Sequence, residues 1–398
     1  ENPFPGFASD DNFDYSTIRL IGTGERIQGA VVEASAYVNH EDLALVTDAD
    51  GNYVEGVIPE PDQTIVLLTQ DPNNPPSHGT AVLGVMGAIN NEYGIRGIAS
   101  GAEMWFFPAN SIEDGERTET AMASLVQYLE PGAVINHSWV FNIVDNSNTF
   151  GLGNILTFKE SFYTLVRLAS DAGMISCIAA GNACQAVANE AGDDSGAIIV
   201  GAINPGPEIG NPFFCNTGIR RWASCNYTDG GARVHVNAWG GAGMTTGYGT
   251  QDGFRFNSAQ QPDGNVYNPA RDLDPLEADF LRSYTPRFQN TSFATPQISG
   301  AAIWLQGFSK MFYDTTLSAS QMRDTVFADR PEMGRENCTN VGSDVCGSDF
   351  VVGEEPHPVG RYPNLPACGV RVITEVGIGY SGKVKVYHGT LIRGGPLS

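Results

Sequence analysis

The chain has 398 residues, of which 41% are apolar and 17% are charged, so it can bury a large core and is neither disordered nor a coiled coil. It has 45 acidic residues against 22 Lys and Arg, a formal net charge of −23 that excludes nucleic acid and anionic membranes as expected partners. No apolar run of about 18 residues is present, so the sequence predicts no membrane-spanning helix.

Apolar runs alternate with segments of helical periodicity along the first half of the chain. In chain order, we predict a strand at 28–33, a helix at 78–89, a strand at 104–107, a helix at 118–129, a strand at 133–138, a helix at 157–172, and strands at 174–180 and 197–202. Two more helices are predicted at 296–311, with Pro296 in the first turn, and at 318–327. The alternation predicts an α/β fold with a mainly parallel central sheet and helices on both faces.

The remaining segments are predicted to lie outside this sheet. Residues 205–230 and 245–290 are rich in Gly, Asn, Pro and Asp, which indicates long surface loops. Residues 335–398 contain alternating Val-Arg-Val-Ile and Lys-Val-Lys-Val, which favours a β-rich C-terminal extension. We therefore divide the chain into a main domain at 1–334 and an extension at 335–398 packed on the same body.

The chain has seven cysteines, and their positions indicate whether the protein is expected in a reducing or an oxidising compartment. Cys177 lies in an apolar run and is predicted to be a buried free thiol, whereas the other six lie in polar loops. Short separations make Cys215–Cys225 and Cys338–Cys346 candidate disulfides and leave Cys184 and Cys368, although connectivity cannot be read from a sequence. Together with a start at Glu1 rather than Met, this pattern leads us to expect a trimmed, secreted protein.

Three segments carry residues suited to nucleophilic catalysis. His78 opens a predicted helix in Ser-His-Gly-Thr, Asn182 ends a predicted strand in Ala-Ala-Gly-Asn, and Ser292 precedes a helix in Asn-Thr-Ser-Phe-Ala-Thr-Pro-Gln-Ile-Ser-Gly. A serine at a helix N-terminus lies near free backbone N–H groups, and an Asn amide can donate to a developing oxyanion. Taken singly, they also fit a surface or capping histidine, a turn asparagine and an N-cap serine. All three in one chain, at strand–helix junctions, favour a catalytic interpretation.

These three segments resemble the subtilisin-like serine proteases, over about residues 17–330. The resemblance implies a subtilisin-like fold, with Ser292 as nucleophile, His78 as general base and acid, and Asn182 as oxyanion donor. It also implies a substrate cleft, whose expected residues are Ser138, Trp139, Val140, Ala180 and Gly181.

The sequence departs from the family pattern at the triad acid. The family has Asp at the end of the first strand, and Glu33 fills that position here, while His40, Asp42 and Leu43 keep the register. We take Glu33 as the acid, with Asp48 and Asp50 as nearby rivals.

Two further departures affect the predicted cleft. Asn290 replaces the family's Gly before Thr-Ser, which predicts an unusual backbone angle or a narrower site. Trp139 and Val140 replace smaller family residues, which predicts reshaped substrate pockets, although Trp139 also fits a core position.

The resemblance further implies a structural Ca²⁺ site. The expected ligands are oxygens of Asp42, Ile89, Asn91, Tyr93 and Ile95, a donor set that a hard cation requires. The alternative for this segment is a plain turn.

The resemblance as a whole implies a secreted serine endopeptidase that hydrolyses protein or peptide substrates through an acyl-enzyme. We expect a monomer with a cleaved propeptide and no nucleic-acid or membrane partner. The main alternative is a weakly active or inactive family member that binds peptides. The serine–carboxyl peptidases are a further alternative, but they have Asp where this chain has Asn182 and lack the His-Gly-Thr helix.

Overall fold

The fold is taken from a computed structural model of the chain. It describes residues 23–67, 76–91, 94–138, 141–144, 150–153, 160–181, 194–204, 220–221, 234–240, 243–247, 284–327, 334–336, 359–362, 368, 385–387 and 390–392.

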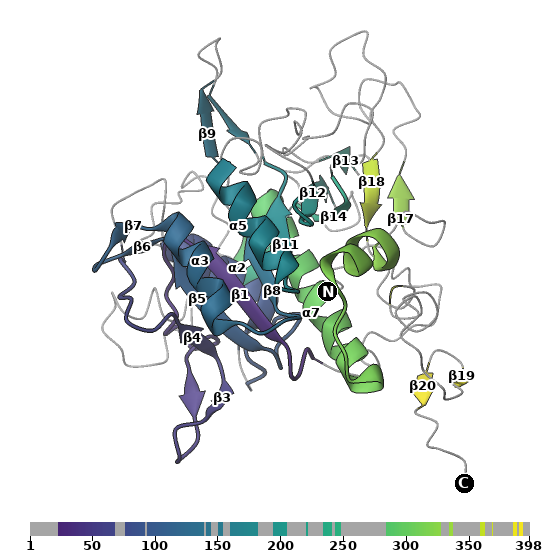
Figure 1. Ribbon diagram of the computed structural model, residues 1–398, viewed down its shortest axis with the longest axis horizontal. Coiled ribbons are helices and arrows are strands. Elements are labelled where there is room, and N and C mark those ends of the chain that lie inside the picture. Colours follow the sequence, from purple (N-terminus) through teal and green to yellow (C-terminus); the bar gives the residue numbers. More distant parts are fainter. Residues whose placement is uncertain are drawn as a thin grey trace.

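A parallel sheet forms the centre of the fold (Figure 1). Its strands lie in the order β4 (Val57–Pro59), β5 (Glu103–Pro108), β1 (Gln28–Glu33), β8 (Val134–His137), β11 (Ile175–Ala179), β12 (Ile198–Asn204) and β14 (Val236–Trp239), all parallel to their neighbours. The short strand β13 (Arg220–Arg221) adds to β12 in antiparallel orientation. The predicted α/β class and mainly parallel sheet are therefore confirmed.

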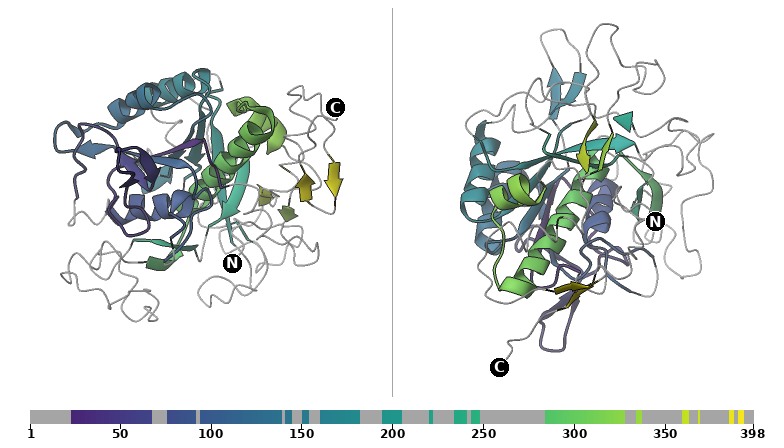
Figure 2. Two further views of the ribbon diagram at one scale, coloured as in Figure 1. Left: turned by 90° about the horizontal axis from the view of Figure 1, so that it is seen from below. Right: turned by 90° about the vertical axis from the view of Figure 1, so that its right-hand side faces the viewer.

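Helices cover both faces of the sheet (Figures 1 and 2). On one face lie α2 (Pro76–Gly87) and α7 (Thr291–Tyr313), and on the other lie α3 (Thr118–Tyr128) and α5 (Glu160–Asp171). Strand β1 shows why both faces are covered: Val31 packs in the core under α2 and α7, whereas Ala30 and Val32 pack in the core under α3 and α5. A strand with successive apolar residues must bury both of its faces.

Two sequence predictions were wrong in this part of the chain. Residues 245–290 were predicted to be a loop, but their described ends, 245–247 and 284–290, take part in the antiparallel pair of β15 (Gly243–Thr246) and β16 (Tyr284–Phe288). Helix α7 begins at Thr291, so Pro296 is its sixth residue and not part of the first turn. Proline at that position removes the N–H that would bond to the carbonyl of Ser292.

The remaining described elements are short. They are the pairs β2 (Val46–Thr47) with β3 (Tyr53–Glu55), β6 (Asn110–Ser111) with β7 (Gly115–Glu116), β9 (Phe141–Val144) with β10 (Phe150–Gly153), β17 (Gly334–Glu336) with β18 (Val359–Tyr362) and β19 (Lys385–Tyr387) with β20 (Thr390–Ile392), and the π-helix η3 (Gln321–Val326). The last two pairs place β structure in the described part of the C-terminal extension, while the division into domains stays a prediction. Within the described ranges, no helix has the length and apolar character needed to cross a membrane.

Candidate active site

Glu33 is the last residue of β1 and lies at the carboxyl edge of the sheet. Side chains alternate along a strand, so Glu33 points to the same face as Val31, the face that α2 and α7 cover. Its side chain is only 3% exposed. Its carbonyl accepts a hydrogen bond of 2.7 Å from the backbone N–H of Ala109, which ties the end of β1 to the neighbouring strand β5. A buried carboxylate in this position needs a partner that offsets its charge.

His78 supplies that partner from the first turn of α2. Its Nδ1 lies 3.1 Å from Oε1 of Glu33. Gly79 makes this approach possible, because a Cβ at that position would lie 2.3 Å from the carbonyl oxygen of Ser35 and 3.2 Å from Cβ of Glu33. The distance is short enough for an ion pair, although Oε1 has no well-aligned hydrogen bond among the described residues.

The pKa of His78 reflects two opposing effects. Burial lowers the pKa of the imidazole, but the charge of Glu33 and its contact with the ring raise it, and the net result is a pKa above the ordinary value. The rival acids play a different part: Asp48 is exposed and accepts hydrogen bonds of 2.9 Å from the N–H groups of Asp50 and Asn52 in a surface turn. The structure therefore brings Glu33, and neither Asp48 nor Asp50, to His78.

Ser292 is the second residue of α7 and is 8% exposed. Its hydroxyl donates a hydrogen bond of 2.9 Å to the backbone carbonyl of Ser138, not to His78. Asn290, which caps the helix, has the unusual backbone angle that the sequence predicted, with φ of 68°. Its ψ of −166° places it in the region of positive φ and extended ψ that is essentially restricted to glycine, so Asn in the family's Gly position holds a strained backbone conformation.

Buried hydrogen bonds hold Ser138 against α7. Asn136 donates to Oγ of Ser138 over 2.9 Å and accepts from Oγ of Ser299 over 2.9 Å. Because Ser299 lies two turns beyond Ser292 on α7, this network fixes the end of β8 relative to the helix that carries the candidate nucleophile. The Ser292–Ser138 contact is thus part of a rigid arrangement.

The predicted substrate and oxyanion residues are placed only in part. Ala180 and Gly181 are buried and follow directly after β11, and Gly181 has φ of 102°. Trp139, Val140 and Asn182 lie outside the described residues. The structure thus brings Ser138, Ala180 and Gly181 to the carboxyl edge of the sheet, where ligands bind in open α/β folds.

The predicted calcium ligands surround a buried carboxylate. Asp42 is fully buried, and its two oxygens accept from Nδ2 of Asn91 over 3.0 Å and from the N–H of Ile95 over 2.8 Å. The N–H of Ile89 donates to the carbonyl of Asp42, and Tyr93 lies outside the described residues.

The negative charge around Asp42 suits a cation, but the side chain of Asn91 does not point an oxygen toward the site. Burial raises the pKa of Asp42 and the adjacent charge of Glu41 raises it further, against the lowering effect of its hydrogen bonds. Gly94 leaves room at the carboxylate, since a Cβ there would lie 2.2 Å from Oδ2 of Asp42. Asn91, however, presents its amide nitrogen, so its oxygen would face an ion only after the amide turns over. Carboxylate, amide and carbonyl oxygens of this kind are ligands that Ca²⁺ prefers, and the calcium site stays a prediction.

The described cysteines are Cys177 and Cys368, and both are buried. Cys177 is a free thiol, as predicted, and burial raises its pKa to about 12. The other cysteines of the candidate disulfides, Cys184, Cys215, Cys225, Cys338 and Cys346, lie outside the described residues. The disulfides therefore stay predictions.

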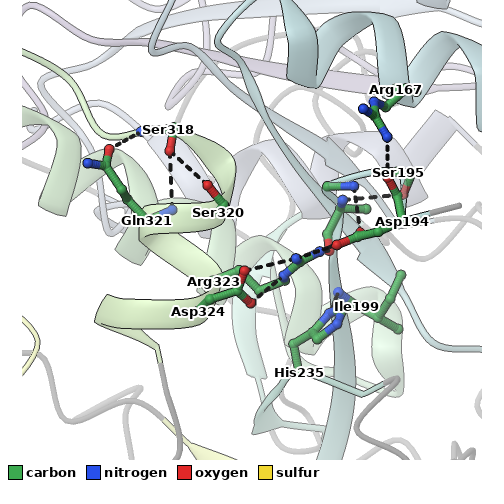
Figure 3. A network of polar contacts seen from close by, with 12 residues as sticks. Arg167, Asp194, Ser195, Ile199, His235, Ser318, Ser320, Gln321, Arg323 and Asp324 are labelled. Carbon is green, nitrogen blue, oxygen red and sulfur yellow. Dashed lines mark hydrogen bonds and ion pairs between the residues drawn. The ribbon is translucent and has the colours of Figure 1, made fainter.

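A second polar cluster lies at the opposite edge of the sheet, where β12 begins (Figure 3). Asp194 accepts from both terminal nitrogens of Arg323 over 2.7 and 2.5 Å, and Arg323 also contacts Asp324. Arg167 of α5 donates to the backbone carbonyl of Asp194 over 2.7 Å. We call Arg167, Asp194, Arg323 and Asp324 the arginine cluster; it joins α5 and η3 to the segment just before β12.

Sequence reasoning missed one contact of His78. Phe288, at the end of β16, packs edge-on against the imidazole with ring centroids 5.6 Å apart and an interplanar angle of 77°. The available signal was the alternation of Tyr284, Pro286 and Phe288 in a segment assigned to a loop. This period of two indicates a strand.

A family comparison matches residues 22–340 of the chain to the subtilase family. The matched segment contains Glu33, His78, Asn182 and Ser292. A search of curated protein sequences found no match.

Solved structures give matches at low sequence identity. The prenylagaramide maturation protease PagA is 14% identical, with a TM-score of 0.55 over 90% of this chain and 97% of that one. A cold-adapted subtilisin-like serine proteinase is 16% identical, with a TM-score of 0.46 over 77% of this chain and 83% of that one. Fervidolysin from Fervidobacterium pennivorans, described as a keratinolytic enzyme related to subtilisin, is 16% identical, with a TM-score of 0.47 over 79% of this chain and 40% of that one. The match to PagA supports the fold alone.

Proposed function

The chain belongs to the subtilase family, a family of serine peptidases, and we propose that it is a serine endopeptidase that cleaves peptide bonds through an acyl-enzyme on Ser292. The observation that carries the proposal is the separation of 3.1 Å between Oε1 of Glu33 and Nδ1 of His78. A buried acid held against a histidine is the arrangement that orients an imidazole for general-base catalysis. Ser292 lies at the same edge of the sheet, through its contact with Ser138.

The proposed mechanism follows from the roles of these three side chains. Glu33 holds the proton on Nδ1 of His78, so Nε2 is free to accept the hydroxyl proton of Ser292 as its oxygen attacks the peptide carbonyl carbon. The backbone N–H of Ser292 and the amide of Asn182 are the proposed donors to the resulting oxyanion. The imidazolium then gives its proton to the leaving amine as the C–N bond breaks. Water then gives a proton to His78 and attacks the acyl carbon. The bond to Ser292 breaks, the serine regains its proton, and the product carboxylic acid leaves.

Ser292 must change its hydrogen bond before it can react. Its hydroxyl donates to the carbonyl of Ser138 in the structure, and proton transfer requires that it donate to His78 instead. We propose that a substrate chain lying along Ser138 competes for that carbonyl and so releases the hydroxyl.

The competing function is peptide binding without cleavage. Two observations favour it: the Ser292–Ser138 hydrogen bond, and the absence of a well-aligned hydrogen bond at Oε1 of Glu33 among the described residues. In this arrangement the Ser292 hydroxyl is not poised to give its proton to His78. Chemical reactivity of Ser292 separates the two functions, because only an activated serine reacts with a fluorophosphonate.

The deciding experiment is fluorophosphonate labelling together with a peptide-cleavage assay. We expect the wild type to be labelled and to cleave, and Ser292→Ala to lose both, with a fall in kcat on the order of 10⁶-fold. Ser309→Ala is the matched control, because Ser309 is also a buried serine on α7. Cleavage by Ser292→Ala equal to that of the wild type would exclude Ser292 as nucleophile. A folded wild type that is not labelled would leave peptide binding as the function.

We further propose that the protein is secreted and works as a monomer after loss of a propeptide, with Cys215–Cys225 and Cys338–Cys346 as disulfides. We also propose that Asp42, Asn91, Ile89, Tyr93 and Ile95 hold Ca²⁺, which would neutralise the buried carboxylate and tie residues 89–95 to the turn at Asp42. The support is the burial of Asp42 next to Glu41, with no Lys or Arg side chain among the described contacts of its carboxylate. This ion would stabilise the fold and take no part in the chemical step.

A further inference from the structure

Two described side chains contact the imidazole of His78. One is the carboxylate of Glu33, 3.1 Å from Nδ1, and the other is the ring of Phe288, whose centroid lies 5.6 Å away. Phe288 is 4% exposed, whereas 22% of the His78 side chain is exposed. The aromatic contact therefore lies on the buried side of the histidine ring.

The contact with Glu33 does not by itself fix the orientation of the ring. It touches one nitrogen, and Oε1 of Glu33 has no well-aligned hydrogen bond among the described residues. Rotation of an imidazole about its Cβ–Cγ bond is broad, without sharply defined wells. A second contact on the face or edge of the ring is needed to restrict that rotation.

Phe288 is itself held by the residue that follows the candidate nucleophile. Its ring packs against Phe293 with centroids 5.8 Å apart and an interplanar angle of 64°. Phe293 fills the space over Gly243, where a Cβ would lie 2.3 Å from Cζ of the Phe293 ring. A chain of aromatic contacts thus runs from His78 through Phe288 to the first turn of α7, which carries Ser292.

The strand pair that carries Phe288 is anchored to α2 without using any candidate catalytic side chain. The hydroxyl of Thr245 donates to the carbonyl of Ala81 over 2.6 Å, and that of Thr246 donates to the carbonyl of Thr80 over 2.7 Å. Both acceptors lie one turn or less beyond His78 on the same helix. Strands β15 and β16 therefore keep a fixed distance from the backbone of His78.

The geometry points to Phe288 as a positioning residue that sets the orientation of the His78 imidazole between Glu33 and Ser292. This inference rests on the proposed peptidase function. The Phe288 ring supplies no acid, base or nucleophile, so we infer that it acts by positioning His78. A misplaced base slows proton transfer in the chemical step but leaves substrate binding unchanged.

The test compares three substitutions. Phe288→Leu removes the ring and keeps the site apolar, Phe288→Tyr keeps the ring, and Phe308→Leu is the control. Phe308 is also buried and packs on Trp304 of α7, farther along the helix from Ser292. Each variant is assayed for kcat and KM on a peptide, for the rate of fluorophosphonate labelling and for melting temperature.

We expect Phe288→Leu to lower kcat and the labelling rate about tenfold, equivalent to about 1.4 kcal/mol, with KM changed less than about twofold. Phe288→Tyr should restore at least half of the wild-type kcat, and Phe308→Leu should leave kcat unchanged even where it lowers the melting temperature. If Phe288→Leu does not fold, Phe288→Met replaces it in the same comparison.

Three results would overturn the inference while leaving the peptidase function intact: an unchanged kcat in Phe288→Leu, an equal loss in Phe288→Tyr, or an equal loss in Phe308→Leu. A wild-type protein that neither cleaves nor is labelled would instead overturn the proposed function, and the inference with it.

Discussion

The carboxylates around α2 and the carboxylate at the start of β12 are paired in different ways. Among the described residues, the carboxylate of Glu33 near the start of α2 is paired with the imidazole of His78. Just beyond the end of α2, the carboxylate of Asp42 accepts from the N–H groups of Asn91 and Ile95, with no Lys or Arg side chain among its described contacts. In the arginine cluster, by contrast, Asp194 takes two hydrogen bonds from Arg323 and lies beside a donor from Arg167. Hydrogen bonding to Arg323 lowers the pKa of Asp194 to about 2.

This difference separates groups that hold the fold from groups that can exchange a proton or an ion. An arginine cannot lose its proton, so Asp194 is locked in its charged form and only joins segments of the chain. Glu33 has a partner that titrates near neutral pH, and Asp42 has a charge that an external cation could neutralise. This contrast agrees with the proposal that the region around α2 is the functional one. Substitutions that remove these pairings test the difference.

The largest effect is expected at Glu33. Glu33→Gln should lower kcat/KM on the order of 10⁴-fold, because the triad acid both orients and stabilises the imidazolium. Glu33→Asp should lose less if the backbone is not adapted to the longer side chain, and should stay strongly impaired if it is.

The pH profile sharpens the prediction at Glu33. Glu33 raises the pKa of His78 against the effect of burial, so its removal lowers that pKa and should move the acid limb of kcat/KM to lower pH. The wild type should gain activity as pH rises through a pKa above about 6.5. Asp48→Asn serves as the control, and a loss of activity there with none in Glu33→Gln would transfer the role of the acid.

The second largest effect is expected from calcium, which should raise the free energy of unfolding. A ligand that binds only the native state adds about 2.7 kcal/mol at a hundredfold excess over Kd. Melting curves with calcium and with a chelator measure the difference, and Asp42→Ala should abolish it. Asp194→Ala is the control, since its partner is already an arginine. A calcium shift that survives in Asp42→Ala would place the ion elsewhere.

His137 should make the fold sensitive to acid. The residue is fully buried, both ring nitrogens lack hydrogen bonds among the described residues, and burial lowers its pKa to about 3. The pKa of this histidine is lower in the folded chain than in the unfolded chain, where it is about 6.5. The free energy of unfolding is therefore unaffected above about pH 6.5 and falls as the pH drops below that value, by about 2 kcal/mol at pH 5. Denaturant unfolding at pH 8 and pH 5 should show a smaller difference for His137→Met than for the wild type. An identical pH dependence in both proteins would show that His137 does not titrate in this range.

The arginine cluster should give the smallest effect, confined to stability. Arg323→Ala should cost about 1–2 kcal/mol, because it removes charged hydrogen bonds whose acceptors are partly exposed. Activity per labelled Ser292 should not change. Arg26→Ala, which breaks an exposed pair with Asp314, should leave the melting temperature unchanged. A loss of activity in Arg323→Ala without a loss of stability would contradict the division drawn between the two regions.

Much of the fold could be predicted because its signals are local. Strand β1 was predicted with the bounds that the structure has, and α3 with an end one residue too long. Strands β15 and β16 were missed because a composition rich in turn residues outweighed a short alternation from Tyr284 to Phe288. The start of α7 was placed too late, because Pro296 is a strong local signal for a first turn and packing on α2 and the sheet overrode it.

The sequence by itself determined the residue types of the candidate site and their places at strand and helix ends. Glu33, His78 and Ser292 could be named because the segments that carry them resemble the subtilisin-like proteases, and the period of apolar residues predicts that they lie at strand and helix ends. Only the tertiary structure decided which acid faces His78, that Ser292 donates to Ser138 and that Phe288 packs on the imidazole. Each of these is a contact between segments far apart in the chain. The distance between such groups is set by the packing of the whole core, and no local pattern encodes it.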